Sequence, residues 1–319
     1  MEGPGRSCPL SYRYAPESFR RPADLNTETL YVAGGLYGNQ QALDALLRLA
    51  EEEAQPFSIV FNGDFNWFNA DDEAFLKVNG RVLDHVATRG NVETELAHGD
   101  EGAGCGCAYP DEVSDIEVAR SNTIMDDLRI VAGRHPHLAA RVATLPMTLV
   151  AQVGETRVGI VHGDAESLSG WGFGVRALST AAGCAHANNL IARAGLDVFA
   201  SSHTCLPLLR EFQSGVLINN GAAGMPNFRQ RRHGLISRIS VHPARHDLRM
   251  YGTRVRDTHV DAIMLDYAHD NFLQSFVRRW PEGSAAHQSY FRRITEGPDY
   301  AVAAASGDAA WAERKVCAA

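Results

Sequence analysis

The sequence predicts a layered α/β fold, and two patterns indicate it. In the first half of the chain, short apolar segments alternate with segments whose apolar residues recur at helical spacing, which is typical of βαβ units. In the second half, between residues 147 and 251, short β-rich segments follow one another with one long helical segment among them. A length of 319 residues suits one large domain or two smaller ones.

The regular elements begin after an irregular arm, which we expect over residues 1–28. Residues 30–33 form a short apolar strand, and a glycine-rich turn then leads into a helix that ends near residue 53. A second strand over 57–61 ends in Asn-Gly-Asp, and a second helix is expected over 72–87. Strand, turn and helix therefore repeat in the order that βαβ units require.

The middle of the chain changes character after the second helix. Residues 93–114 are expected to form a loop, because several glycines surround two cysteines there, and a helix follows over 113–131. One helix is then expected over 175–194. The strands of this part are expected over residues 147–153, 157–161, 198–201, 208–212, 216–219, 235–241 and 248–251.

The last part of the chain returns to helical spacing over residues 260–293, and a frayed tail is expected from residue 301. We therefore divide the chain into an arm (1–28), a main domain (29–252) and a helical C-terminal extension (253–319).

Composition is that of an ordinary globular protein. Apolar residues make up 45% of the chain and charged residues 21%, which excludes a disordered, collagen-like or coiled-coil protein. The 30 Lys and Arg residues against 38 Asp and Glu give a net charge of −8. We expect no nucleic-acid binding, because such a surface repels a phosphate backbone.

Targeting signals and cysteine usage point to one compartment. No apolar run approaches about 18 residues, so we expect no membrane span, and the first residues lack the apolar segment of a secretory signal. Six cysteines are too few to staple a chain of this size, and Cys105 and Cys107 are too close for easy mutual bridging. We therefore expect a cytoplasmic protein with reduced thiols.

Polar residues gather where the predicted strands end. Asp64, His162 and His203 each follow such a strand, and Asn91 follows the third element of the chain. Ligands of α/β sheets bind in the crevice outside the carboxyl ends of the strands. One carboxylate, one amide oxygen and two imidazoles form a suitable ligand set for a divalent metal ion. The four together favour a metal site, although each alone is commonly a hydrogen-bonded structural residue.

The order of these motifs resembles the calcineurin-like metallophosphoesterases, in particular the small bacterial phosphodiesterase type. That family carries D-x-H-G-N, G-D, G-N-[HC]-[DE], H-G and G-H-[TS]-H in series. The corresponding segments here are Gly35-Leu36-Tyr37-Gly38-Asn39, Gly63-Asp64, Gly90-Asn91-Val92-Glu93, His162-Gly163 and Ser202-His203-Thr204-Cys205. The resemblance covers roughly residues 29–252 and implies a four-layer α/β/β/α sandwich, the metallophosphoesterase fold.

The resemblance also implies one complete metal site and one altered site. The complete site is expected to hold a divalent ion (Mn, Fe or Zn) through Asp64, Asn91, His162 and His203. The family's second site uses the Asp and His of the first block, the bridging Asp and the last His. Those positions are occupied here by Gly35, Tyr37, Asp64 and Cys205.

Three interpretations of the altered site stay open at this stage. In the first, the protein is a hydrolase with one metal ion, and a side chain supplies part of the missing positive charge. In the second, Tyr37 and Cys205 are themselves metal ligands, in a site suited to a softer or higher-valent ion. In the third, the protein is catalytically silent and binds a phosphorylated ligand or a protein partner.

The expected activity is hydrolysis of a small phosphate mono- or diester by metal-activated water. Asp64 and Asn91 are expected to act at the metal, while Arg89, Tyr37 and Asn39, or backbone amides, offset the charge of the transition state. Tyr37 and Asn39 are also the expected substrate contacts. The sequence makes no prediction about the oligomeric state.

The third block departs from the family in one catalytic position. Val92 stands where the family has a histidine that is thought to protonate the leaving group, so this role is empty or filled from elsewhere. Glu93, the next residue, is expected to hydrogen-bond a ligand imidazole or a neighbouring backbone group.

Overall fold

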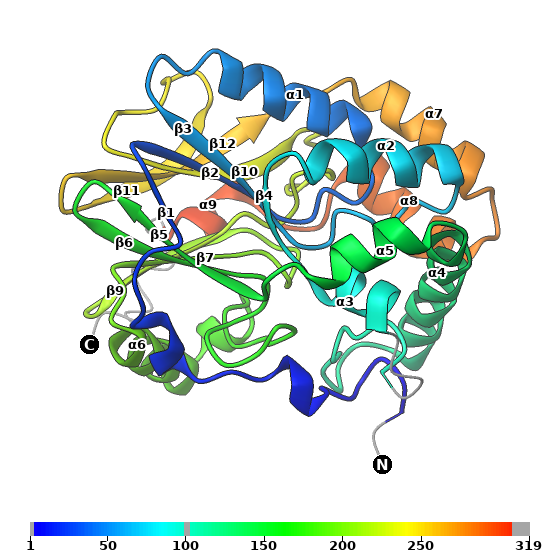
Figure 1. The fold of residues 1–319 in the computed structure, drawn as a ribbon, viewed down its shortest axis with the longest axis horizontal. Coiled ribbons are helices and arrows are strands. Elements are labelled where there is room, and N and C mark those ends of the chain that lie inside the picture. Colours follow the sequence, from blue (N-terminus) through cyan, green and yellow to red (C-terminus); the bar gives the residue numbers. More distant parts are fainter. Residues whose placement is uncertain (1–2, 99–102, 308–319) are drawn as a thin grey trace.

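Two mixed β-sheets face each other at the centre of the molecule (Figure 1). In the residues that the computed structural model describes, 3–98 and 103–307, each sheet has six strands. One sheet has the order β1 (Leu25–Thr27), β5 (Thr148–Val153), β6 (Thr156–Val161), β7 (Val198–Ser201), β9 (Gly215–Asn219) and β8 (Leu208–Phe212). The other has the order β11 (Arg249–Val255), β12 (Thr258–Leu265), β10 (Gly234–Ser240), β2 (Thr29–Ala33), β3 (Phe57–Asn62) and β4 (Val86–Thr88).

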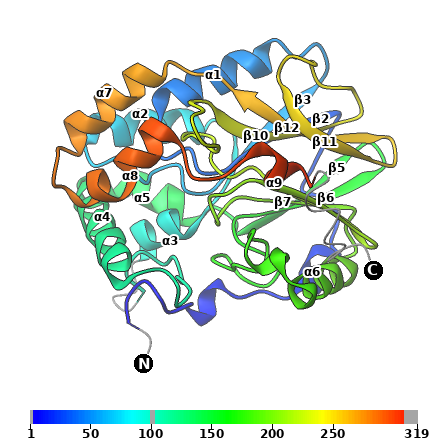
Figure 2. The same ribbon diagram turned by 180° about the vertical axis from the view of Figure 1, so that it is seen from behind.

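Helices cover the outer face of each sheet. The sheet that contains β2 is covered by α1 (Gln40–Glu51), α2 (Asp72–Val82) and α7 (His269–Arg279), and the other sheet is covered by α6 (Ala181–Ala194). At one end of both sheets lie α3 (Asn91–His98), α4 (Asp115–Arg134), α5 (Pro136–Ala143) and α8 (Ala285–Glu296) (Figure 2). This order of layers confirms the predicted four-layer α/β/β/α sandwich.

The strand β2 shows how the layers are held together. Side chains of a strand point alternately to the two faces of its sheet. Leu30 and Val32 accordingly pack into the core between the sheets, while Tyr31 and Ala33 pack into the core under the helices. All five residues of β2 are buried, as expected for a strand that is covered on both faces.

Two elements beside the third block differ from the prediction. The helix expected over 72–87 ends at Val82, and Val86–Thr88 forms β4, which runs parallel to β3. The first part of the loop expected over 93–114 is helix α3, which starts directly after β4. Glu93 stabilises that start, because an acidic residue in the first turn interacts favourably with the free backbone N–H groups of a helix.

The helix expected over 260–293 is wrong in its first part. Residues Thr258–Leu265 form β12, which pairs in antiparallel fashion with β10 and β11. Thr258, Val260 and Ile263 are β-branched, and such side chains pack well on a pleated surface. The C-terminal extension is therefore not wholly helical, and both β1 and β12 carry the sheets beyond the expected limits at residues 28 and 252.

The first and the last described segments both pack against the sandwich. The N-terminal arm contains two 3-10 turns, Leu10–Tyr12 and Pro16–Phe19, and runs along the molecule towards α6 (Figure 1). The expected tail contains the short helix α9 (Val302–Ser306), and residues 308–319 lie outside the described part. Within the described part, every helix is too short or too polar to cross a membrane.

Candidate metal centre

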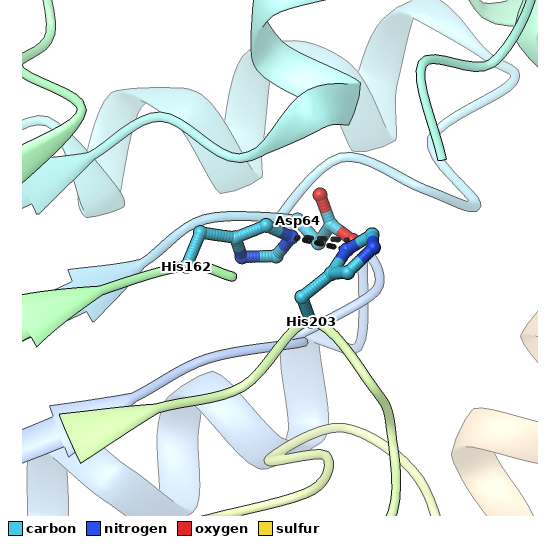
Figure 3. Close-up of side chains that lie close together, drawn as sticks. All are labelled: Asp64, His162 and His203. Atoms are coloured by element: carbon cyan, nitrogen blue, oxygen red, sulfur yellow. Dashed lines mark hydrogen bonds and ion pairs between the residues drawn. The ribbon is translucent and has the colours of Figure 1, made fainter. Parts of the chain in front are cut away.

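Four strand ends bring the expected ligands together. Asp64 follows β3 and Asn91 follows β4, and these two strands are parallel neighbours. His162 follows β6 and His203 follows β7, which are parallel neighbours in the facing sheet. Figure 3 shows the side chains of Asp64, His162 and His203 pointing toward one another, and their ligand atoms lie within 4.8 Å of each other.

The orientation of both imidazoles is fixed by backbone carbonyls. The Nδ1 atom of His162 lies 3.0 Å from the carbonyl oxygen of Asn62, and the Nε2 atom of His203 lies 3.1 Å from that of Cys107. A carbonyl oxygen only accepts hydrogen bonds, so these outer nitrogens carry the N–H. In the neutral rings the inner nitrogens, which lie 3.2 Å apart, therefore present lone pairs to each other.

The two oxygen ligands face the same point. Asn91 donates from Nδ2 to the Cys105 carbonyl (3.0 Å), which turns its Oδ1 to within 3.1 Å of His162 Nε2. Asp64 Oδ2 lies 3.3 Å from the same nitrogen. Four electron-rich atoms thus converge without a donor among them when both histidines are neutral. A divalent cation fits this donor set, and the carbonyl partners of the imidazoles are typical supports of metal ligands.

The ionisation of these groups agrees with a site for positive charge. Burial alone would lower the pKa of His162, but the Asp64 carboxylate raises it above its usual value. Burial opposes ionisation of Asp64, yet the charge on His162 holds the pKa of Asp64 below its usual value. Burial and the neighbouring His162 lower the pKa of His203 to about 3, so this imidazole is neutral and free to act as a ligand at neutral pH.

Glu93 holds the loop that carries Asp64. Its carboxylate accepts hydrogen bonds from the backbone N–H groups of Asp64 (2.7 Å), Gly90 (3.0 Å) and Phe65 (3.0 Å). Burial, together with the charge of Asp64, raises the pKa of Glu93 to about 7. Of the two expected partners of Glu93, the structure shows the backbone and not an imidazole. Glu93 therefore positions a metal ligand and does not itself face the cation.

In the altered half of the site, the side chains of Tyr37 and Cys205 are hydrogen-bonded to each other. The Tyr37 hydroxyl lies 2.8 Å from the Cys205 thiol, and burial raises the pKa of both groups above their usual values. A side chain at Gly35 would collide with the Tyr37 ring, because a Cβ there would lie 2.9 Å from Tyr37 Cε2. The ring of Tyr37 therefore occupies the space that a ligand at position 35 would need.

Backbone geometry also marks this region. Tyr37, Asp64 and Cys205 have φ angles of +53°, +54° and +58°, in the left-handed region that non-glycine residues rarely adopt. Such conformations cost about 1–3 kcal/mol each and cluster at functional sites. Three sharp turns at strand ends thus aim three side chains into one cavity.

Three expected site residues have other contacts than the sequence suggested. Cys205 is bonded to Tyr37 and does not join the cluster of ligand atoms formed by Asp64 and the histidines. The Asn39 side chain caps α1 by accepting from Ala42 N (2.9 Å), and it donates to the Gly224 carbonyl (2.8 Å). Arg89 donates to the Ala143 carbonyl (3.1 Å). Neither Asn39, the expected substrate contact, nor Arg89, expected to offset the charge of the transition state, lines the cavity described next. The structure therefore does not place either side chain where its expected role requires it.

A cavity of about 500 Å3 opens above the cluster. Asp64, Asn91, Val92, Tyr37 and Cys205 are among the residues that line it. Its walls include aromatic side chains and one cation, which are Trp67, Tyr109, Trp171, Tyr290 and Arg293. The residues from the loop before α4 and from α8 carry no sequence signal that links them to the strand ends, because tertiary packing alone brings them there.

The segment with Cys105 and Cys107 supports the ligands through its backbone. Its two carbonyls accept hydrogen bonds from Asn91 and His203, and the Trp171 indole also donates to the Cys107 carbonyl (3.0 Å). The sulfur atoms of the two cysteines face each other, with Cα atoms 5.4 Å apart. The pair is therefore placed where a disulfide can form, contrary to the expectation that the two residues are too close to bridge.

Comparison with known proteins supports the fold. No protein-family model matches the sequence, and no curated protein matches it. A hypothetical protein from Pyrococcus horikoshii superimposes with a TM-score of 0.57 at 14% identity, over 85% of this chain and 99% of that chain. A metallophosphoesterase from Sphaerobacter thermophilus gives 0.52 at 15% identity, over 85% of this chain and all (100%) of that chain. The chain thus has the metallophosphoesterase fold, as the motif series predicts.

Proposed function

We propose that this protein hydrolyses a phosphate mono- or diester with a single divalent cation, Mn, Fe or Zn, as its cofactor. The observation that carries the proposal is the convergence of four donor atoms at four strand ends, from Asp64, Asn91, His162 and His203. The cavity above these atoms has room for a small phosphoester. The solved Sphaerobacter thermophilus protein with this fold is described as a metallophosphoesterase, which supports the same reaction class.

Each part of the site has a role in this reaction. A divalent ion at these ligands lowers the pKa of water and polarises a phosphoryl oxygen. Asp64 and Asn91 hold the ion from one sheet, and the two histidines hold it from the other. The raised pKa of Tyr37, caused by burial, keeps its hydroxyl protonated. Tyr37 lines the cavity, and its hydroxyl can donate a hydrogen bond to a substrate oxygen, whereas Val92, which also lines the cavity, has no proton to donate.

The test combines metal content with turnover. We expect elemental analysis of the purified protein, loaded with Mn, Fe or Zn, to give close to one ion per chain. A generic aryl phosphodiester or phosphomonoester should be hydrolysed, and a chelator should abolish the activity until metal is restored. The absence of any bound ion after loading would overturn the proposal. A bound ion with no hydrolysis over a broad phosphoester panel would instead favour the silent, ligand-binding protein.

A further inference from the structure

Arg293 reaches the candidate site from α8, far along the chain from the strand ends. Its Nη2 donates to the Cys205 carbonyl (2.5 Å), and it lines the same cavity as Tyr37, Cys205 and Asp64. Burial raises the pKa of both Tyr37 and Cys205, and the Arg293 charge opposes that rise. A cation therefore stands beside the two side chains that occupy the positions of absent metal ligands.

The guanidinium of Arg293 has an N–H donor without a hydrogen-bond partner. Its Nε is buried and has no hydrogen-bond partner, and among residues 3–98 and 103–307 no carboxylate forms an ion pair with it. The next residue, Arg292, is exposed and pairs with Glu296 (3.0 Å). A partly desolvated cation without an anion is unfavourable, and the planar guanidinium matches two oxygens of a phosphate group.

The position of Arg293 does not depend on its own charge. Ile294 is fully buried, and its carbonyl accepts a hydrogen bond from His269 Nε2 (2.8 Å). The Tyr290 ring packs edge-on against Phe68, with ring centroids 5.1 Å apart. These contacts hold α8 against the sandwich, so replacement of the Arg293 side chain should leave the helix in place.

We propose that Arg293 binds a phosphoryl oxygen of the substrate and supplies, from α8, the positive charge that a second metal ion supplies in two-metal phosphoesterases. This inference rests on the proposed function and adds a catalytic residue to it. The cluster around Asp64 would hold a cation at one part of the cavity lining, and Arg293 supplies a fixed positive charge at another. Such a charge stabilises the phosphoryl group without further reorganisation.

The experiment compares Arg293→Gln with Arg292→Gln, a matched control from the same helix that points to solvent. Inorganic phosphate is titrated by calorimetry into each metal-loaded protein, and aryl phosphoester turnover is measured in parallel. We expect Arg293→Gln to weaken phosphate binding and to lower kcat/KM by about 10- to 100-fold each, the range for one charged bidentate contact. Metal content and Tm should match the wild type, and Arg292→Gln should change nothing.

Two further measurements separate substrate contact from structural support. Arg293→Lys should retain part of the phosphate affinity and turnover that Arg293→Gln loses, because an ammonium keeps the positive charge but cannot donate two parallel hydrogen bonds. Free guanidinium chloride at millimolar concentration should raise the turnover of Arg293→Ala, an effect that a structural role would not give.

The outcomes also separate this inference from the proposed function. If Arg293→Gln binds phosphate and turns over like the wild type, the inference fails while Asp64-dependent hydrolysis stands. If the wild type binds phosphate through Arg293 but hydrolyses no phosphoester, the proposed function fails while the phosphate contact stands. Absence of phosphate binding by the metal-loaded wild type would overturn the inference as well.

Discussion

The candidate site has two halves, which are built on the same sandwich but offer different chemistry. In one half, Asp64, Asn91, His162 and His203 place four donor atoms around one point, and each is held by a backbone contact behind it. In the other half, Tyr37 and Cys205 are bonded to each other, and Arg293 from α8 lies against Cys205. The first half is arranged to bind a metal cation, and the second half already contains a positive charge, the guanidinium of Arg293.

The difference shows that the altered half has been repacked as a unit. The Tyr37 ring fills the space above Gly35, its hydroxyl meets Cys205, and Arg293 closes the group from the side. The Tyr37 ring occupies the room that a side chain at position 35 would need, and Tyr37, Cys205 and Arg293 are linked by hydrogen bonds. If Arg293 supplies the charge of the missing metal ion, as we propose, the two halves should respond differently to the following changes.

The largest effect is expected at Asp64, the only carboxylate among the four donors of the first half. Asp64→Asn keeps the shape of the side chain and tolerates the left-handed backbone, but it removes the negative charge that holds the cation. We expect kcat/KM to fall by about 100-fold or more, since removal of one electrostatic contact to the reacting group costs that much. Activity that survives this change would come from another site. Asp126→Asn, at an exposed carboxylate on α4, is the matched control.

The second effect is loss of a direct metal ligand. His203→Ala should weaken metal binding by about 100-fold or more, because changes in outer contacts of ligands already cost about 10- to 100-fold. Metal affinity is measured by competition with a chromogenic chelator. His186→Ala, at an exposed histidine on α6, should leave the affinity unchanged. Equal affinities in the two variants would show that His203 does not hold the ion.

The third effect concerns the repacked half. Gly35→Asp alone should destabilise the protein by about 2–4 kcal/mol, because the new Cβ collides with the Tyr37 ring and φ at this position is +64°. Thermal unfolding measures this loss. Gly80→Ala, in α2 with open space around it, should instead stabilise by about 1 kcal/mol.

Combining Gly35→Asp with Tyr37→His and Cys205→His should recover part of the stability that Gly35→Asp loses. It should also raise metal binding from one ion per chain to two. The added cation should raise turnover or change the metal preference. A wild-type protein that already saturates at two ions would contradict this contrast and favour Tyr37 and Cys205 as ligands.

The sequence predicted one half of the site better than the other, for a physical reason. Asp64, His162 and His203 follow strands that the local pattern predicts, so pattern and sheet topology together place them. Asn91 follows β4, a strand that the local pattern did not predict, and only the motif series indicated it. Arg293 could not be found in this way, because its position depends on how α8 packs against the sandwich. Local sequence carries no signal for such a contact.

Two errors in the sequence analysis have local causes. Asn39 is the last residue of the first block, and its side chain caps α1. Its place in the motif suggested a substrate contact and gave no sign of this capping role. Leu265, in β12, has a helical spacing of seven residues to Phe272. The segment is nevertheless a strand, because β10 and β11 offer it pairing partners on both sides.

The smallest effect is the pH dependence of metal binding in the first half. Burial acts to lower the pKa of His162, but Asp64 outweighs it and raises this pKa above the usual value of about 6.5. Below the raised pKa, His162 carries a proton that the cation must displace, so affinity should fall about tenfold per pH unit. Above it, His162 is neutral and affinity should level off. His203, with a pKa lowered to about 3 by burial and the nearby His162, adds no step in this range.

Calorimetric titrations at pH 6, 7 and 8, in two buffers of different ionisation enthalpy, should show release of close to one proton at the lowest pH. An affinity independent of pH over this range would mean that His162 does not bind the ion.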